Sequence, residues 1–381
     1  MNSSPIKLAV RLLFNGLRFR CLKLTGKMGK PQALSIEITH RCIARCVMCN
    51  IWKIPSDIKD IEVKKWLEVL SEDLFSDLRE LDITGGEPFL VSDLPFFLLG
   101  ISKLKDRNLR NLKSIAITTN GFLTLRIREV VSEILPGLRD KNIDLVVVCA
   151  MDAVGPLHEK IRNYKNAWPR VNDTVEELIN LRERFPNIII GLKTTVLPMN
   201  VDELKQIAHY AEARGMFTII SPCIITKGRY LNEDRAADLA FTPQQIKKMV
   251  NFYESNMFKW SFHGRSLVGY YKKGFMRKPC SCGFNYFFIR SSGDVYPCPL
   301  VPITLGNVAQ IPLEQILSSR EASRFRRKVG HFPECRRCTE PGLERYALAY
   351  EGFTYLSLMF KMRFGEFNQL HTHMGLEKYF D

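Results

Sequence analysis

Three closely spaced cysteines are the feature of this sequence that most constrains its fold and chemistry. Cys42, Cys46 and Cys49 follow the spacing C-x3-C-x2-C, and no fourth cysteine lies nearby. A closed tetrahedral metal site needs four protein ligands. Three thiolates on a four-iron cluster instead leave one iron without a protein ligand. The spacing therefore predicts an open 4Fe-4S cluster whose free iron can hold a small molecule.

Other uses of these cysteines fit the sequence less well. Disulfides form in oxidising compartments, and the sequence shows no secretory signal. A zinc site would borrow His40 as its fourth ligand, but adjacent His and Cys side chains chelate one metal poorly. The eleven cysteines of the chain therefore indicate a reducing cytoplasm and metal ligation.

Two glycine-containing turns follow the cysteine run, each at the end of a strand-like segment. Residues 81–88 read as a strand that ends in Gly-Gly-Glu-Pro, and residues 115–121 as a strand that ends in Thr-Thr-Asn-Gly. The pairing of C-x3-C-x2-C with a downstream Gly-Gly-Glu-Pro is highly specific. On these motifs the chain resembles the radical S-adenosylmethionine (radical SAM) enzymes over about residues 33–225.

Strand and helix signals alternate through the middle of the chain, which favours a parallel α/β sheet. We expect strands at 33–39, 79–84, 113–118, 142–150, 187–197 and 216–223, with helices at 63–71, 125–135, 174–185 and 201–213. The predicted fold class is α/β: the partial (β/α)6 TIM-type barrel of the resembled family, with a small C-terminal cysteine-rich iron–sulfur module. The three motifs then fall at the carboxyl ends of strands, where parallel barrels place their chemistry.

Changes in composition and motifs along the sequence predict five regions. They are a basic amphipathic N-terminal segment (1–32), a radical SAM partial barrel (33–225), a helical linker region (226–279), an auxiliary cluster module (280–340) and a C-terminal amphipathic tail (341–381).

The resemblance implies a cofactor and a reaction. SAM would chelate the free iron through its amino and carboxylate groups, and an electron from the oxygen-sensitive cluster would cleave it. The 5′-deoxyadenosyl radical so formed would abstract hydrogen from an unactivated C–H bond. In this scheme the cofactor carries the hard chemistry, and the protein supplies position and exclusion of water.

The resemblance also assigns cofactor-binding residues. Gly85, Gly86 and Glu87 match the motif that receives the methionine amino group, and glycine permits close approach. Met48 matches the position near the adenine, and its alternative role is plain packing.

A further strand gives a partial match to the family. Asp152 and Arg162 are retained, and the guanidinium of Arg162 would bind the cofactor carboxylate or ribose. The usual serine is Ala150, so one ribose hydrogen bond is missing. Asn120 is a candidate cofactor or substrate contact. A structural role is the alternative for Asp152 and for Asn120.

A second cysteine set occupies the C-terminal region. The pattern C-x10-G-x4-C, then Gly-Asn, then C-x2-C resembles the auxiliary-cluster module called SPASM, or its shorter twitch form. No cysteine follows Cys338, so we expect one auxiliary 4Fe-4S cluster with an electron-transfer role. Its four expected ligands are Cys282, Cys298, Cys335 and Cys338, and Cys280 is a fifth candidate that could replace Cys282. A structural zinc site is the alternative.

The net charge of the chain and its distribution indicate which kinds of partner it could bind. The net charge of +15 favours an anionic partner or simply a solvated basic surface. Residues 6–24 read as a basic amphipathic helix, too interrupted by charge to span a bilayer. This helix would lie on an anionic membrane surface or pack on the protein's own barrel. Residues 346–364 form a second amphipathic element or a C-terminal core helix. The expected location is therefore the cytoplasm, with peripheral contact at the inner membrane surface as an extension.

The main functional hypothesis is a radical SAM enzyme that acts on an anionic or lipid-linked small molecule and takes electrons from a donor such as flavodoxin or ferredoxin. A SPASM-type peptide or protein maturase is one alternative, and a non-catalytic iron–sulfur redox or scaffold protein is another. RNA is a disfavoured partner, because no basic, aromatic-interleaved RNA-binding module is present.

Overall fold

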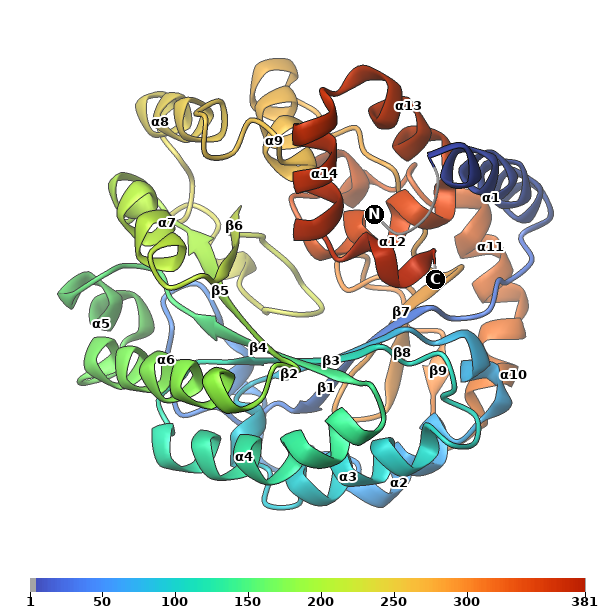
Figure 1. Ribbon diagram of the computed structural model, residues 1–381, viewed down its shortest axis with the longest axis horizontal. Helices are drawn as coiled ribbons and strands as arrows, with labels where there is room; N and C mark the ends of the chain where they lie inside the picture. The colour runs from blue at the N-terminus through green and yellow to red at the C-terminus, as the bar shows by residue number, and fades with distance from the viewer. Residues whose placement is uncertain (1–4, 381) are drawn as a thin grey trace.

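A single open sheet organises the computed structural model, which describes residues 5–380 (Figure 1). Its strand order is β6-β5-β4-β3-β2-β1-β7-β8-β9. The strands are β1 (Ala33–Thr39), β2 (Glu80–Gly85), β3 (Ser114–Thr119), β4 (Asp144–Ala150), β5 (Ile188–Val196), β6 (Phe217–Pro222), β7 (Tyr286–Ile289), β8 (Asp294–Tyr296) and β9 (Gly306–Asn307). Strands β1 to β7 pair in parallel, whereas β8 and β9 pair antiparallel. The two edge strands do not meet, so the expectation of a partial barrel is confirmed.

The six expected strands occur within two residues of their predicted bounds. Most of their Ile, Val and Leu side chains are buried, as parallel strands covered on both faces require, whereas Ile189 in β5 is exposed. The helices that follow them along the chain are α2 (Val63–Leu70), α3 (Leu94–Leu104), α4 (Thr124–Asp140), α5 (Pro156–Arg162), α6 (Ala167–Arg184) and α7 (Leu204–Glu212). Helices α3 and α5 were missing from the sequence prediction, and α6 begins seven residues earlier than expected.

The remaining helices lie away from this outer layer. They are α1 (Pro5–Thr25), α8 (Pro243–Tyr253), α9 (Phe262–Lys273), α10 (Leu313–Ser318), α11 (Arg320–Lys328), α12 (Gly342–Glu351), α13 (Phe353–Lys361) and α14 (Phe364–His373). Helices α12 and α14 lie on the side of the sheet opposite α2 to α4 (Figure 1). They therefore cover the inner face of the sheet, which the open barrel does not enclose by itself.

The cysteine-rich C-terminal region continues the sheet of the barrel. Strand β7 pairs in parallel with β1, from Ala33 opposite Tyr286 to Ile36 opposite Ile289. Because β1 leads directly into the Cys42–Cys49 loop, this pairing holds the two cysteine regions on neighbouring strands.

The predicted element at 346–364 is two helices, because Gly352 separates α12 from α13. Gly352 has φ +74°, and a Cβ there would lie 2.1 Å from the backbone oxygen of Leu12 in α1. Glycine permits both the backbone conformation and the close helix contact. Helix α1 therefore packs on the C-terminal helices, with Leu8, Leu12 and Phe19 buried.

Candidate active site

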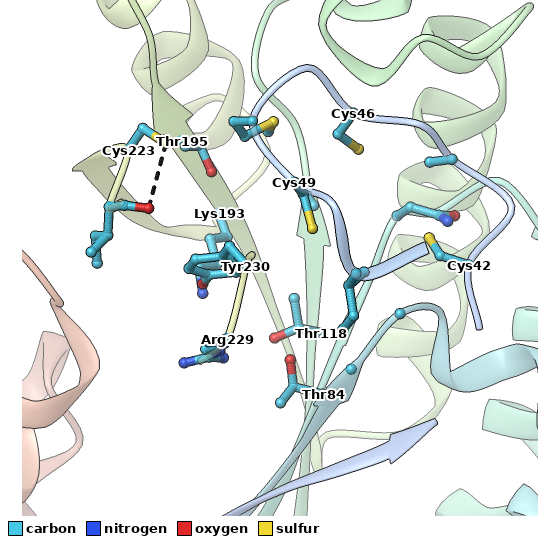
Figure 2. A pocket seen from close by; sticks show the side chains of 18 of the residues that line it. Cys42, Cys46, Cys49, Thr84, Thr118, Lys193, Thr195, Cys223, Arg229 and Tyr230 are labelled. Atoms are coloured by element: carbon cyan, nitrogen blue, oxygen red, sulfur yellow. Dashed lines mark hydrogen bonds between the residues drawn. The ribbon is translucent and has the colours of Figure 1, made fainter. Parts of the chain in front are cut away.

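The first three cysteines lie on the loop after β1, at the carboxyl end of the sheet. Two backbone hydrogen bonds hold this loop on α5: Arg45 N donates to Arg162 O (3.2 Å) and Val47 N donates to Ile161 O (2.9 Å). Figure 2 shows the sulfur atoms of Cys42, Cys46 and Cys49 around one space enclosed by the loop. The predicted trio is therefore brought together.

The chemistry of this trio fits an iron–sulfur cluster. Burial and the neighbouring Cys46 raise the pKa of the Cys42 thiol to about 11. Burial and the same neighbour raise the pKa of Cys49 to about 12. Three such thiols ionise together only against added positive charge, which iron supplies on binding. The residues present thus suit a metal cluster better than they suit free thiolates.

Glycine is required where β2 meets the cysteine loop. A Cβ on Gly85, whose φ is +134°, would lie 2.1 Å from Thr39 O, and a Cβ on Gly86 would lie 2.0 Å from Arg41 O. Both glycines line the cavity beside the three cysteines, together with Met48, Asn120 and Ala150. We call this space the cluster cavity. The buried Asn120 uses its Oδ1 to accept from Phe122 N (2.9 Å), whereas its Nδ2 has no partner within residues 5–380. That amide nitrogen suits an acceptor on a bound molecule.

Arg162 joins the cysteine loop to a buried carboxylate. Its Nη2 lies 2.8 Å from Asp152 Oδ2, and its Nη1 lies 3.8 Å from Cys46 Sγ. Burial lowers the pKa of Arg162, but the charges of Asp152 and Cys46 raise it by more. The net shift is therefore upward, and the guanidinium stays charged. Asp152 is fully buried and accepts a hydrogen bond from Thr195 N (2.8 Å). Arg162 lines the cluster cavity and Asp152 does not. Asp152 thus positions Arg162, and direct cofactor contact by Asp152 stays a prediction.

Glu87, like Asp152, is a buried carboxylate behind the wall of the cluster cavity. Its fully buried carboxylate accepts from Thr119 Oγ1 (2.8 Å), Asn120 N (2.8 Å) and Phe89 N (3.2 Å). These bonds tie the turn after β2 to the end of β3. The side chain does not line the cluster cavity, whereas Gly85 and Gly86 do. Direct contact of Glu87 with the methionine amino group stays a prediction.

The buried position of Glu87 makes the free energy of unfolding depend on pH. Burial raises its pKa from 4.5 to about 7, against the three hydrogen bonds. Because the folded state binds this proton more tightly than the unfolded state, the stabilisation is present below about pH 4.5 and is lost as pH rises through about 7. Between these pH values the unfolding free energy of the wild type should fall relative to that of Glu87→Gln by about 3 kcal/mol. Anaerobic urea unfolding at several pH values measures this. Exposed Glu133→Gln is the control, and parallel curves for wild type and Glu87→Gln would contradict the assignment.

A second cavity adjoins the cluster cavity. It is lined by residues of β1 to β7 and closed by α9 and α12, and we call it the inner cavity. The two cavities share Thr118, Lys193, Arg229, Glu340 and Pro341. Figure 2 shows Lys193 and Arg229 across the space from the cysteine loop. A molecule in the inner cavity therefore faces the cluster cavity.

Several cavity residues escaped the sequence prediction. Arg229 and Tyr230 come from the segment expected to be a linker, and Glu340 follows the C-x2-C pair. Arg229 Nη1 lies 4.0 Å from Glu340 Oε2, and both side chains are buried. Cys223, which no sequence motif singled out, lines the wall of the cluster cavity. Apart from the nearness of Glu340 to the cysteines, no sequence signal marks these residues.

Ser221, His263 and Glu344 form a hydrogen-bonded chain at the inner cavity. His263 Nε2 lies 3.2 Å from Ser221 Oγ, and His263 Nδ1 lies 3.1 Å from Glu344 Oε1. Ser221 Oγ also donates to Thr339 O (2.6 Å). Glu344 Oε1 also lies 3.0 Å from Lys278 Nζ, and although burial would raise the pKa of Glu344, the charge of Lys278 lowers it, so the carboxylate stays ionised beside His263.

The second cysteine set is gathered beside this chain. Cys282, Cys298 and Cys338 lie in one buried cluster, with Cys280 packed against it, whereas Cys335 is half-buried and close enough to Cys280 and Cys298 to feel their charge. A hydrogen bond from Cys282 lowers the pKa of Cys280 to about 7. Cys280 thus stays as good a candidate as Cys282. Over residues 5–380, no three Cys, His, Asp or Glu side chains converge on a single metal ion. Cysteines on a four-iron cluster each bind a different iron.

Comparison with known proteins identifies the family. Residues 36–211 match the family model of the radical SAM superfamily, and residues 280–339 match that of the SPASM iron–sulfur cluster-binding domain. The chain belongs to the radical SAM superfamily. Its members are enzymes, and this radical SAM protein carries a SPASM domain at its C-terminus. These domains imply a 4Fe-4S cluster with SAM and an auxiliary iron–sulfur cluster.

The curated relatives of this radical SAM enzyme include two maturation proteins from Bacillus subtilis. The sporulation killing factor maturation protein SkfB is 20% identical over 79% of this chain and 68% of SkfB. The antilisterial bacteriocin subtilosin biosynthesis protein AlbA is 21% identical over 77% of this chain and 61% of AlbA. The chain thus spans about two thirds of the length of these relatives.

A solved structure supports the fold. Streptococcus suis SuiB bound to its precursor peptide SuiA superposes with a TM-score of 0.56 at 16% identity, covering 92% of this chain and 77% of SuiB. At this identity the likeness shows the fold of the radical SAM enzyme and nothing of its substrate.

Proposed function

We propose that this radical SAM enzyme abstracts a hydrogen atom from an unactivated C–H bond of an anionic substrate held in the inner cavity. The observation that carries the proposal is the continuity of the two cavities through Thr118, Lys193 and Arg229. The family membership favours an enzyme over the non-catalytic scaffold that the sequence left open.

The roles of the residues follow from their positions. When bound, the 4Fe-4S cluster supplies the electron that cleaves SAM to a 5′-deoxyadenosyl radical. Cys42, Cys46 and Cys49 would hold that cluster, and Arg162 would hold an anionic group of the cofactor. Helices α9 and α12 close the inner cavity and exclude water from the reacting atoms.

Two cations support an anionic substrate. Lys193 is half-buried, lines both cavities and makes no ion pair within residues 5–380. Arg229 is buried beside it and is only distantly paired with Glu340. A substrate phosphate or carboxylate would form an ion pair with Lys193 and would also help to balance the positive charge of Arg229.

A peptide substrate is the second candidate, favoured by the similarity to SkfB and AlbA. The two substrate classes can be separated by isotope transfer. The reduced enzyme and SAM are incubated with lipid or peptide fractions from cells grown on deuterated medium. Deuterium in 5′-deoxyadenosine from the anionic lipid fraction supports the proposal, and deuterium from the peptide fraction alone contradicts it.

Two partners complete the proposal. A reducing donor such as flavodoxin or ferredoxin would deliver electrons, and a membrane surface would give access to a lipid-linked substrate. No helix in residues 5–380 is long and apolar enough to cross a bilayer.

The auxiliary cysteines should matter for turnover more than for SAM cleavage. Replacing Cys335 with alanine removes one ligand candidate far along the chain from the Cys42–Cys49 loop. We expect reductive formation of 5′-deoxyadenosine within about twofold of wild type, but product formation reduced by at least about tenfold. Cys21→Ala, at an exposed position on α1, is the control. Unfolding of Cys335→Ala would instead make the second site structural.

A further inference from the structure

Helix α1 exposes an apolar stripe along its outer face. Ile6, Val10, Leu13, Phe14, Leu17 and Leu24 are all exposed. Their spacing of three, four or seven residues places them on one side of the helix. The exposed fractions are 75% at Ile6, 65% at Phe14 and 57% at Leu17. We call this set the outer face of α1. A continuous apolar stripe of this kind marks an interaction surface.

The opposite side of α1 is firmly packed. Leu8, Leu12 and Phe19 are buried, and a Cβ on Gly16 would lie 2.7 Å from the ring of Phe353 in α13. Asn15 Nδ2 donates to Ala349 O in α12 (2.9 Å). Figure 1 shows α1 at the periphery, beside α13. The helix is therefore fixed in orientation, and its outer face points away from the protein's own core.

Positive charge borders this outer face. Residues 5–25 hold five Lys or Arg residues and no Asp or Glu. Lys7, Arg11 and Arg18 flank the stripe along one edge, and Arg20 lies on the other edge. Apolar side chains between rows of basic ones are the pattern of helices that lie in the interface of an anionic bilayer.

The C-terminal part of the described chain repeats this combination of exposed apolar and basic side chains. At the junction of α13 and α14, Phe360 and Phe364 are 75% and 76% exposed, and Lys361 and Arg363 are exposed beside them. Helix α13 itself packs on α1, where Phe353 contacts Gly16.

We propose that the outer face of α1 docks the enzyme on an anionic lipid surface. This inference deepens the membrane contact proposed above by naming the surface that makes it. A second copy of the chain is a poorer occupant, because facing α1 helices would bring like charges together. Anionic headgroups instead complement the basic borders, while the stripe enters the acyl boundary.

Vesicle sedimentation of the reconstituted holoenzyme tests the proposal. The probes are vesicles of phosphatidylcholine alone and of phosphatidylcholine mixed with phosphatidylglycerol. We expect binding to the mixed vesicles at least about tenfold tighter than to phosphatidylcholine. Phe14→Ser/Leu17→Ser should weaken binding to the mixed vesicles by at least about tenfold. Lys7→Glu should weaken it by several-fold, and more at low salt.

Matched controls exclude general effects on the surface. Leu125→Ser removes an equally exposed apolar side chain on α4, and Lys165→Glu reverses an exposed charge between α5 and α6. Neither should change vesicle binding by more than about twofold. SAM cleavage in solution should be unchanged in every variant, which separates failure of docking from failure of the radical chemistry.

Three results would overturn the proposal. They are equal binding to neutral and anionic vesicles, unchanged binding of Phe14→Ser/Leu17→Ser, and a dimer in solution that this double variant dissociates. The last result would assign the outer face to a second copy of the chain.

Discussion

Replacing Cys46 with alanine is expected to abolish reductive cleavage of SAM. Cys46 Sγ faces the space shared with Cys42 and Cys49, and it contacts Arg162 (3.8 Å). Loss of a residue outside the ligand sphere already costs about 10–100-fold in metal affinity or activity. Loss of one of only three ligands should cost at least about a hundredfold. Chromatography of 5′-deoxyadenosine after anaerobic reduction with dithionite measures this.

Cys223→Ala is the matched control for Cys46→Ala. Cys223 lines the same cavity, but it follows strand β6 and lies outside the Cys42–Cys49 loop that carries the trio. The Cys223→Ala variant should keep the iron of the first cluster and cleave SAM. Retained cleavage in Cys46→Ala would remove Cys46 from the ligand set.

Replacing Arg162 with methionine should have the largest effect on stability. The substitution leaves Asp152 as an unpaired, fully buried carboxylate. Removing one partner of a buried ion pair costs about 3–5 kcal/mol. The same change removes the guanidinium that faces the cluster cavity, so SAM binding should weaken as well. Anaerobic urea unfolding and equilibrium binding of SAM measure the two effects separately.

A double variant separates the two roles of Arg162. Asp152→Asn combined with Arg162→Met removes both charges, while the asparagine oxygen still accepts from Thr195 N. We expect the unfolding free energy to recover by more than half, since a neutralised pair is close to neutral for stability. SAM binding should stay weak. Full recovery of SAM binding in the double variant would mean that Arg162 makes no contact with the cofactor.

The barrel strands could be read from the sequence because their signals are local. Runs such as residues 145–150 are apolar throughout, and each ends in a polar or glycine-containing turn. The cysteine spacing and the Gly-Gly-Glu-Pro turn are also local. Parallel topology then places them at the same edge of the sheet. The cysteine trio and both glycines of the turn accordingly line one cavity at that edge.

The closure of the site depends on contacts between distant parts of the chain. Strand β7 is four residues long, and its pairing with β1 joins residues about 250 positions apart. Arg229 and Glu340 lie outside helices and strands and carry no periodicity that would place them. Gly352 interrupts a run that reads as one helix, because α1 approaches it from the other end of the chain.

The outer face of α1 shows why amphipathic patterns need a structure to interpret them. The sequence left two alternatives for residues 6–24, a membrane surface or packing on the protein itself. In the structure, Leu8 and Leu12 pack inward while Val10 and Phe14 face outward. The helix is apolar on two sides, so packing accounts for one side only, and the docking proposal concerns the other.

Iron and sulfide content per chain after anaerobic reconstitution tests the central claim most directly. The wild type is compared with the Cys42→Ala/Cys46→Ala/Cys49→Ala variant. The account predicts about eight irons in the wild type and about four in the variant, because the SPASM cysteines would still hold the auxiliary cluster. About four irons falling to none, with zinc bound in both proteins, would contradict the account and make the C-terminal site a structural zinc centre.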